Sequence, residues 1–141
     1  MKRLAVAGLI LALSSSLGCL GQSATAPTDY TIVSPVTELF QGTLDPKGAP
    51  FYSFIVGNPD PVRLTLVSVT TASGAAVTTS LKLGFGVPDG TTCATTFSTT
   101  TSSSLAAQYL TVASPGTYCV IVSDPGTLTS SLSFTVRISH S

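Results

Sequence analysis

The stretch LSFTVRIS, residues 132–139, alternates apolar and polar residues over its whole length. Side chains at every second position of a strand lie on the same face, whereas a helix repeats about every 3.6 residues. The stretch LKLGFGV, residues 81–87, shows the same alternation and is followed by the turn sequence Pro-Asp-Gly. Both stretches are therefore predicted to be β-strands with one buried face.

Similar alternation recurs along the rest of the chain, and no segment carries a convincing helical repeat. Apolar residues hold even positions in residues 62–66, but Val67 and Val69 hold odd ones, which predicts a β-bulge or a strand that passes between sheets. Many short strands separated by Pro and Gly turns are typical of an all-β, antiparallel sandwich or barrel. About eight strands are expected, at residues 37–44, 51–56, 62–70, 81–87, 91–99, 106–112, 117–123 and 132–139.

The N-terminal segment has the features of a secretory signal peptide. Lys2 and Arg3 provide positive charge, residues 4–13 are uncharged and almost wholly apolar, and small residues follow up to Gly18. The apolar run is about half of the roughly 20 residues that a membrane-spanning helix needs. Residues 1–18 are therefore predicted to be removed on export.

Cys19 follows Gly18 in a pattern that resembles the lipobox of bacterial lipoproteins, where a small residue precedes a cysteine that becomes diacylated. The resemblance implies a lipid on Cys19 that anchors the chain in a membrane. Leu20 after it implies transport to the outer membrane or cell surface, as in Gram-negative lipoproteins. Ser16 and Gly18 also suit ordinary signal peptidase, so a soluble periplasmic or extracellular protein is the alternative. Cys19 would then remain an odd, exposed thiol.

The composition beyond the leader points to one small domain. Residues 19–29 are small and polar, which predicts a flexible tether reaching about 15–20 Å, and residues 30–141 suffice for one core. Only 9% of the chain is charged, and removal of residues 1–18 leaves four basic residues against six acidic ones, a net charge of −2. The domain therefore lacks the basic surface expected for nucleic acid and the polybasic segment expected for anionic lipid.

Two cysteines remain once Cys19 is assigned to the lipid. Cys93 and Cys119 both lie on predicted strands, 26 positions apart, and an exported protein with an even pair is expected to oxidise it. Such a disulfide would stabilise the domain by about 3–4 kcal/mol through the unfolded state. Two separate reduced cysteines in the core are the alternative. A metal site is not expected, because two thiols without a nearby histidine cannot complete a tetrahedral shell.

The chain offers few residues for catalysis. Its one histidine, His140, is expected to fray near the end of the chain, and no Gly-x-Ser-x-Gly motif is present. A calcium site made from two neighbouring loops is considered, but no carboxylate cluster supplies the roughly six to eight oxygens that calcium prefers. We therefore expect no catalytic residue, no metal and no cofactor. The aspartates beside Pro or Gly are expected to stabilise turns, namely Asp45, Asp60, Asp89 and Asp124.

Aromatic side chains that share the parity of apolar strand residues are expected in the core, above all Tyr52, Phe54, Tyr109 and Tyr118. Tyr30 and Phe51 are the best candidates for exposure. There is no Trp to form a sugar-stacking platform. The Thr-rich run at residues 95–104 is interpreted as a solvated strand and loop, with a glycosylated loop or a glycan-facing array as alternatives.

Three short motifs resemble the bacterial pre-peptidase C-terminal domain: FQGTL at residues 40–44, FYSFIV at 51–56 and SPGTYCV at 114–120. The likeness covers most of residues 36–138. It implies a jelly-roll-like β-sandwich with a non-catalytic role in secretion, localisation or substrate attachment. The chain departs from the family at Lys82, where acidic residues are usual.

These observations predict an exported, lipid-anchored, non-catalytic β-sandwich protein for binding or adhesion at the bacterial cell surface. Its expected contacts are the membrane, through Cys19, and a cell-surface glycan or protein. An accessory subunit that docks on a secreted enzyme or envelope complex is the first alternative. An enzyme of unfamiliar type is the second.

Overall fold

The structure is a computed structural model that describes residues 34–141. The predicted leader at residues 1–18, the lipidation site Cys19, the tether up to residue 29 and Tyr30 lie outside the described residues. Within residues 34–141, every regular element is a strand, and no helix has the length and hydropathy that a membrane crossing requires.

All eight predicted strands are present, and their boundaries differ from the predicted ones by at most three residues. The alternation of apolar and polar side chains is therefore sufficient to locate the strands of this domain. The strands are β1 (Val36–Leu44), β2 (Phe51–Val56), β3 (Asp60–Thr71), β4 (Leu81–Asp89), β5 (Thr92–Thr101), β6 (Tyr109–Ala113), β7 (Gly116–Ser123) and β8 (Leu132–His140).

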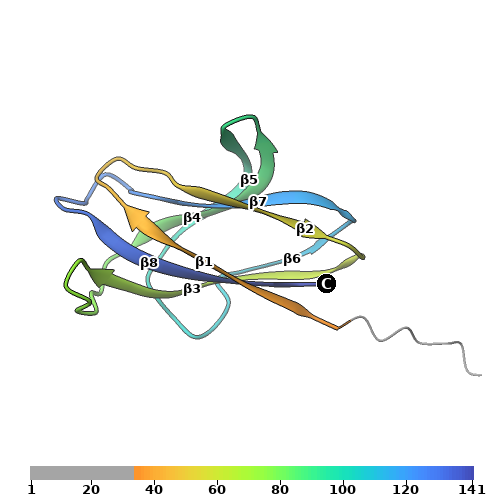
Figure 1. Ribbon diagram of the computed structural model, residues 1–141, viewed down its shortest axis with the longest axis horizontal. Coiled ribbons are helices and arrows are strands. Elements are labelled where there is room, and N and C mark those ends of the chain that lie inside the picture. The colour runs from red at the N-terminus through yellow and green to blue at the C-terminus, as the bar shows by residue number, and fades with distance from the viewer. Residues whose placement is uncertain (1–33) are drawn as a thin grey trace, which may run out of the picture. The chain divides into compact units, whose positions relative to one another are not determined.

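The strands form two four-stranded antiparallel sheets (Figure 1). The β1 sheet has the order β1-β8-β3-β6, and the β2 sheet has the order β2-β7-β4-β5. β8 thus lies between β1 and β3, and β7 lies between β2 and β4, as in two Greek keys wound into a jelly roll. The predicted all-β, antiparallel, jelly-roll-like sandwich is confirmed.

The parity switch in β3 is a β-bulge. The pairing of β3 with β8 shifts between Leu66 and Ser68, so that Leu66 before the bulge and Val69 after it are both buried. An extra residue in one strand reverses the inward parity without moving the strand to another sheet. Val67, which shares the odd parity of Val69, is half-buried.

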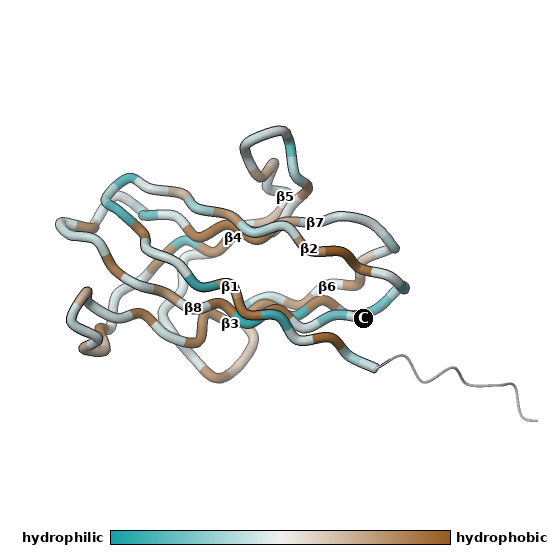
Figure 2. The backbone as a smooth tube through the Cα atoms, in the orientation of Figure 1, coloured by the Kyte–Doolittle hydropathy of each residue, from teal (hydrophilic) through white to brown (hydrophobic). Residues whose placement is uncertain are grey.

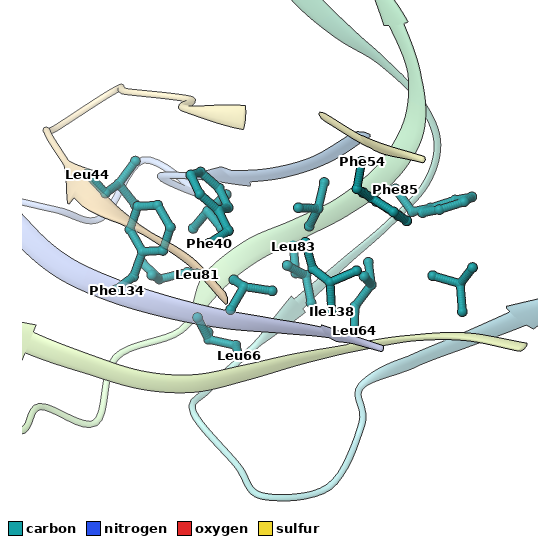
Figure 3. Packing of buried hydrophobic residues seen from close by; sticks show 14 of the residues in the cluster. Phe40, Leu44, Phe54, Leu64, Leu66, Leu81, Leu83, Phe85, Phe134 and Ile138 are labelled. Atoms are coloured by element: carbon teal, nitrogen blue, oxygen red, sulfur yellow. The ribbon is translucent and has the colours of Figure 1, made fainter. Parts of the chain in front are cut away.

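The core lies between the two sheets. Hydrophobic segments run along the strands of both layers (Figure 2), and the labelled side chains project from both layers into the space between them (Figure 3). β8 buries every second residue from Leu132 to His140, as its sequence predicts. Complete burial of one aliphatic side chain contributes about 1.5–3 kcal/mol, so this layer of side chains is the main stabilising term.

Aromatic side chains fill one end of the core, as predicted from their parity. The ring of Phe85 lies 6.4 Å from that of Phe54 and 5.2 Å from that of Tyr118, while Tyr109 stacks on Phe97 at 4.1 Å. Such offset or tilted pairs add about 0.5–1.5 kcal/mol each to the burial of their surface. Phe51, which was expected to be exposed, is half-buried.

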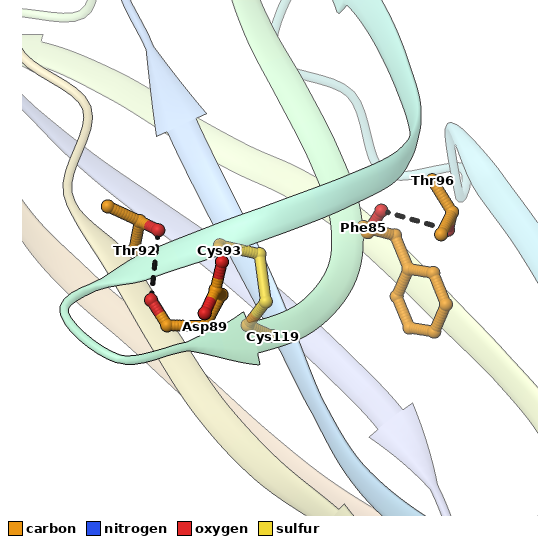
Figure 4. Close-up of a disulfide and its surroundings, with 6 residues drawn as sticks. All are labelled: Phe85, Asp89, Thr92, Cys93, Thr96 and Cys119. Carbon is orange, nitrogen blue, oxygen red and sulfur yellow. Dashed lines mark hydrogen bonds between the residues drawn. A yellow bond between two sulfur atoms is a disulfide. The ribbon is translucent and has the colours of Figure 1, made fainter.

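The predicted disulfide joins Cys93 of β5 to Cys119 of β7 (Figure 4), with a Cα–Cα distance of 5.9 Å. β4 lies between these two strands in the sheet. Two strands on either side of a third are normally about 9.5 Å apart. The two cysteines can therefore meet only because β5 folds across β4, and Figure 4 shows β5 passing over it.

Two glycines of β4 make this crossing feasible. A Cβ on Gly86 would lie 2.0 Å from the carbonyl oxygen of Ala94, and a Cβ on Gly84 would lie 2.9 Å from Thr95 Cγ2, both in β5. The pairing of β4 with β5 also shifts between Phe85 and Gly86. The glycines that alternate with apolar residues in residues 81–87 thus provide room for a folded-over neighbour strand.

Candidate functional site

A row of polar residues crosses the outer face of the β1 sheet. Ser139 of β8 is paired with Thr37 of β1 on one side and with Arg63 of β3 on the other. Two residues earlier on the same face, Arg137 is paired with Thr65 of β3. Because side chains at every second position of a strand share a face, these five residues lie together outside the core.

These residues border a cavity of about 340 Å³, which is the size of a small ligand site. The cavity is open to solvent on the outer side of the sheet. We call it the arginine pocket, and its lining residues are Thr37, Arg63, Thr65, Ala107, Arg137 and Ser139.

The segment at residues 102–108, between β5 and β6, forms one wall of the pocket. Its backbone is bonded to β3 where Ser104 N–H donates to Leu66 O and Gln108 N–H donates to Leu64 O, both at 2.9 Å. The side-chain amide of Gln108 continues the pairing, since its Oε1 accepts from Leu66 N–H at 2.7 Å. The wall is therefore fixed to the sheet by hydrogen bonds.

This anchoring corrects the predicted start of the sixth strand. The sequence placed the strand at residues 106–112, but β6 begins at Tyr109. Before that point the Gln108 side chain, rather than a second strand backbone, satisfies the N–H of Leu66. Ala107 is consequently available to line the pocket.

Two guanidinium groups dominate the electrostatics of the pocket, and none of the six lining residues is acidic. Arg137 Nη2 donates to Leu105 O at 3.2 Å, which holds this side chain against the wall. Arg63 makes no side-chain hydrogen bond or ion pair with any residue of the described segment. Arg63 and Arg137 are diagonal neighbours on adjacent strands, a spacing of about 7–8 Å between backbones. The pocket therefore concentrates positive charge on a domain that is otherwise poor in cations.

Three hydroxyls accompany the arginines. Thr65 is 2% exposed because the wall covers it, although it lies on the outer side of the sheet. Thr37 and Ser139 complete the set. Each hydroxyl can donate one hydrogen bond and accept two, so the pocket offers both kinds of polar group.

The sequence alone did not identify this site. Arg63 and Arg137 stand between apolar residues of two predicted strands, but those strands are far apart in the chain. Only the strand order, with β8 inserted between β1 and β3, brings them together. A single sequence carries no direct signal of that order.

A second polar cluster lies at the edge of the core. His140 Nε2 is 2.8 Å from Glu38 Oε1, and the Tyr52 hydroxyl donates to Glu38 Oε2. The hydrogen bond to the Glu38 carboxylate raises the pKa of Tyr52 above its ordinary value, because it favours the protonated phenol. The network ties the β1 sheet to the β2 sheet.

The expectation that His140 is frayed is wrong. His140 is the last residue of β8, is 3% exposed, and packs its ring 5.1 Å from that of Phe54. Its Nδ1 is buried and has no partner within the described segment. The histidine lies on the inward parity of β8, whereas its neighbour Ser139 faces the pocket.

Asp124 stabilises a turn, as predicted. Its Oδ1 accepts from the backbone N–H groups of Gly126, Thr127 and Leu128, and its Oδ2 accepts from Lys47 N–H at 2.9 Å. The bond from Lys47 contributes most to lowering the pKa of Asp124, and the other three act in the same direction. One carboxylate thus joins the turn after β7 to the turn after β1.

The other aspartates differ in their roles. Asp45 lies in the turn after β1, and its carboxylate accepts from the Ser131 hydroxyl. Asp60 is the first residue of β3 and Asp89 the last residue of β4, so both are strand ends rather than turn centres. Within residues 34–141, no group of three or more His, Cys, Asp or Glu side chains is arranged to hold a metal ion.

The Thr-rich run at residues 95–104 is mainly a solvated strand and loop, as interpreted from its sequence. Its residues up to Thr101 belong to β5, and Thr96 Oγ1 donates to Phe85 O at 3.3 Å.

Comparisons with known proteins assign no family to the chain. A scan against protein-family models gave no match, and a search among curated proteins found no similar sequence.

Proposed function

We propose that this chain is an exported, lipid-anchored, non-catalytic β-sandwich protein that binds a ligand at the bacterial cell surface. The observation that carries the proposal is the arginine pocket, in which Arg63 and Arg137 face a cavity of about 340 Å³ without an acidic lining residue. Two positive charges held close together repel each other. An anionic ligand that binds between them offsets this repulsion. A binding site explains why two of the few cations are placed here.

Export is supported by the disulfide between Cys93 and Cys119. Structural disulfides persist in oxidising compartments and are rare in the cytosol of most organisms. The leader pattern before Cys19 and the resemblance to the pre-peptidase C-terminal domain point the same way. The jelly-roll strand order is also what that resemblance implies.

A non-catalytic role is supported by the position of His140. Hydroxyl nucleophiles need an adjacent base, and histidine is the commonest one. The only histidine of the sequence is bonded to Glu38 and packed against Phe54, on the face of the β1 sheet opposite the pocket. The pocket hydroxyls therefore have no histidine to activate them.

The lipid anchor is tested by replacing Cys19 with serine. Metabolic labelling with a fatty acid should mark the wild-type chain and not the Cys19→Ser variant, which should also move from the membrane fraction to the soluble one. The double variant Cys93→Ala with Cys119→Ala keeps Cys19, leaves no unpaired cysteine in the domain, and controls for effects of cysteine loss in general. Membrane retention of Cys19→Ser equal to that of the wild type would exclude lipid anchoring.

An accessory subunit that docks on another protein is the second candidate. Large apolar side chains are exposed near the pocket: Leu39, paired with Arg137, is 58% exposed, and Leu110, paired with Arg63, is 60% exposed. Val112, further along β6, is 73% exposed. Arginine is enriched at protein interfaces, and the fully buried core of an interface is more apolar than its rim.

Pull-downs separate the two candidates. The chain is offered to envelope glycans and, separately, to envelope proteins. Ligand binding through the pocket predicts that Arg63→Gln abolishes capture of a glycan while Leu39→Ser does not. Recovery of one protein partner without any glycan signal, lost in Leu39→Ser, would favour the accessory subunit.

A further inference from the structure

We propose that the arginine pocket binds the carboxylate of an acidic saccharide. The inference rests on the proposed function of ligand binding at the cell surface and adds the chemical class of the ligand. It is argued from the guanidinium groups, the hydroxyls and the missing aromatic residues of the pocket.

The guanidinium groups select a planar oxyanion. A guanidinium has five donors in a rigid fork that matches the two oxygens of a carboxylate. Arg137 uses one donor on Leu105 O and keeps the others, and Arg63 uses none on the residues of the described segment. A carboxylate between the two side chains would accept charge-assisted hydrogen bonds from both and would remove their mutual repulsion.

The pocket hydroxyls favour a sugar as the part of the ligand that bears the carboxylate. Thr37, Thr65 and Ser139 can donate and accept, and sugar hydroxyls can do the same. Thr65 lines the pocket, and its hydroxyl can make such a hydrogen bond to a sugar. Sulfate offers only acceptors and would leave the acceptor sites of these hydroxyls unused, and inorganic phosphate near pH 7 has fewer donor hydroxyls than a sugar. The volume of about 340 Å³ is at the small end for ligand sites and suits a single sugar unit.

Because the pocket lining has no aromatic side chain, binding of a sugar there depends on the carboxylate of the ligand. None of the six lining residues is aromatic, so the described segment offers a neutral sugar no ring to stack on there. The affinity for an acidic saccharide must therefore come from contacts between its carboxylate and the arginines. Salt screens such charged contacts over about 10 Å at 0.1 M ionic strength. Binding is therefore expected to weaken as salt concentration rises.

The test is isothermal titration calorimetry of the purified full chain in detergent with four probes: sodium glucuronate, glucose, sodium acetate and inorganic phosphate. Glucuronate should bind, glucose should give no binding signal, and acetate and phosphate should bind at least about tenfold more weakly, the worth of one or two hydrogen bonds. Sodium chloride added to the glucuronate titration should weaken it.

Variants locate the binding. Arg63→Gln and Arg137→Gln should each weaken glucuronate binding by about 10- to 100-fold, because each removes charge-assisted hydrogen bonds. Thr65→Val, which keeps the side-chain shape, should weaken glucuronate more than acetate. Lys82→Gln is the matched control: it removes one positive charge from an exposed site on the β2 sheet and should leave the affinity unchanged.

Two results would overturn the inference: no measurable glucuronate binding by a folded chain, or phosphate binding as tight as that of glucuronate, which would mark a general anion site. Either result leaves the proposed function standing if capture from envelope material still depends on Arg63. Loss of that dependence would instead count against the proposed function itself.

Discussion

Asp124 holds two turns together through one carboxylate. Four backbone N–H groups donate to it, and one of them belongs to Lys47, whose φ of 64° lies in the left-handed region that disfavours a residue with a Cβ. The hydrogen bond that Lys47 N–H donates to Asp124 offsets part of that strain. At the scale of single residues, this turn is the feature whose energetics depend most directly on pH.

We predict that Asp124→Asn lowers the urea midpoint at pH 7. The folded-state pKa of Asp124 is lowered by the donated hydrogen bonds, so the ionised form contributes stability at every pH above its unfolded value of 3.8. That contribution is lost as pH falls through the lower folded-state pKa. The difference between wild type and variant should therefore shrink below pH 3.8. Asp89→Asn, a change at an exposed strand end, should give no such pH-dependent gap.

Gly86 is the second residue with a decisive local role. We predict that Gly86→Ala destabilises the fold by about 1–3 kcal/mol or more, because the new Cβ would meet the backbone carbonyl of Ala94 at 2.0 Å. Backbone cannot rotate away as a side chain can. Gly57→Ala, whose Cβ would meet nothing nearer than 4.0 Å, is the control and should unfold near the wild-type midpoint. Equal midpoints for the two variants would contradict this account of the β4–β5 crossing.

At the scale of elements, the β4–β5 hairpin and its disulfide form one unit. Cys93 can reach Cys119 only when β5 folds across β4. The disulfide therefore holds β5 in this crossed position. The loop it closes spans 26 positions. The constraint acts mainly on the unfolded chain, and its size grows slowly with loop length.

Replacing both body cysteines, as Cys93→Ala with Cys119→Ala, should lower the free energy of unfolding by about 3–4 kcal/mol relative to the oxidised protein. Chemical denaturation measures this difference, and the oxidised and reduced wild-type chains provide an internal comparison. Alkylation of the native protein should leave Cys93 and Cys119 unmodified, because a disulfide has no free thiol. Two reactive thiols in native, exported protein would contradict the bond.

Strand positions could be predicted from the sequence because they depend on local alternation. The alternation within residues 132–139 and within residues 81–87 predicts one buried face for each strand. The change of apolar parity at Val67 predicts the bulge that is found between Leu66 and Ser68. The start of β6 was misplaced because the Gln108 side chain substitutes for strand backbone. That substitution depends on a partner, Leu66, that lies far away in the sequence.

At the scale of the whole molecule, the candidate site could not be predicted, because it is a product of strand order. Arg63 and Arg137 become neighbours only when β8 inserts between β1 and β3. The prediction that His140 frays was wrong for a related reason. It rested on the position of His140 near the end of the sequence, whereas the burial of His140 depends on the packing of β8 inside the sandwich. The disulfide was accessible to prediction, since the number of cysteines and the pattern that predicts export can both be read from the sequence alone.

The proposed binding face is the outer face of the β1 sheet, and the proposed anchor is a lipid on Cys19. The charge balance of the domain is slightly acidic, so a general attraction to anions is not expected from net charge. Anion binding should therefore depend on the local geometry of the pocket and not on cations elsewhere.

The most direct measurement is retention of the full chain on beads that carry saccharide extracted from bacterial envelopes. The wild type should be retained at low salt and released as salt rises. The double variant Arg63→Gln with Arg137→Gln should pass through, whereas Lys47→Gln with Lys82→Gln, which removes the same charge from other sites, should be retained like the wild type. Equal retention of the two double variants would contradict the assignment of binding to the arginine pocket.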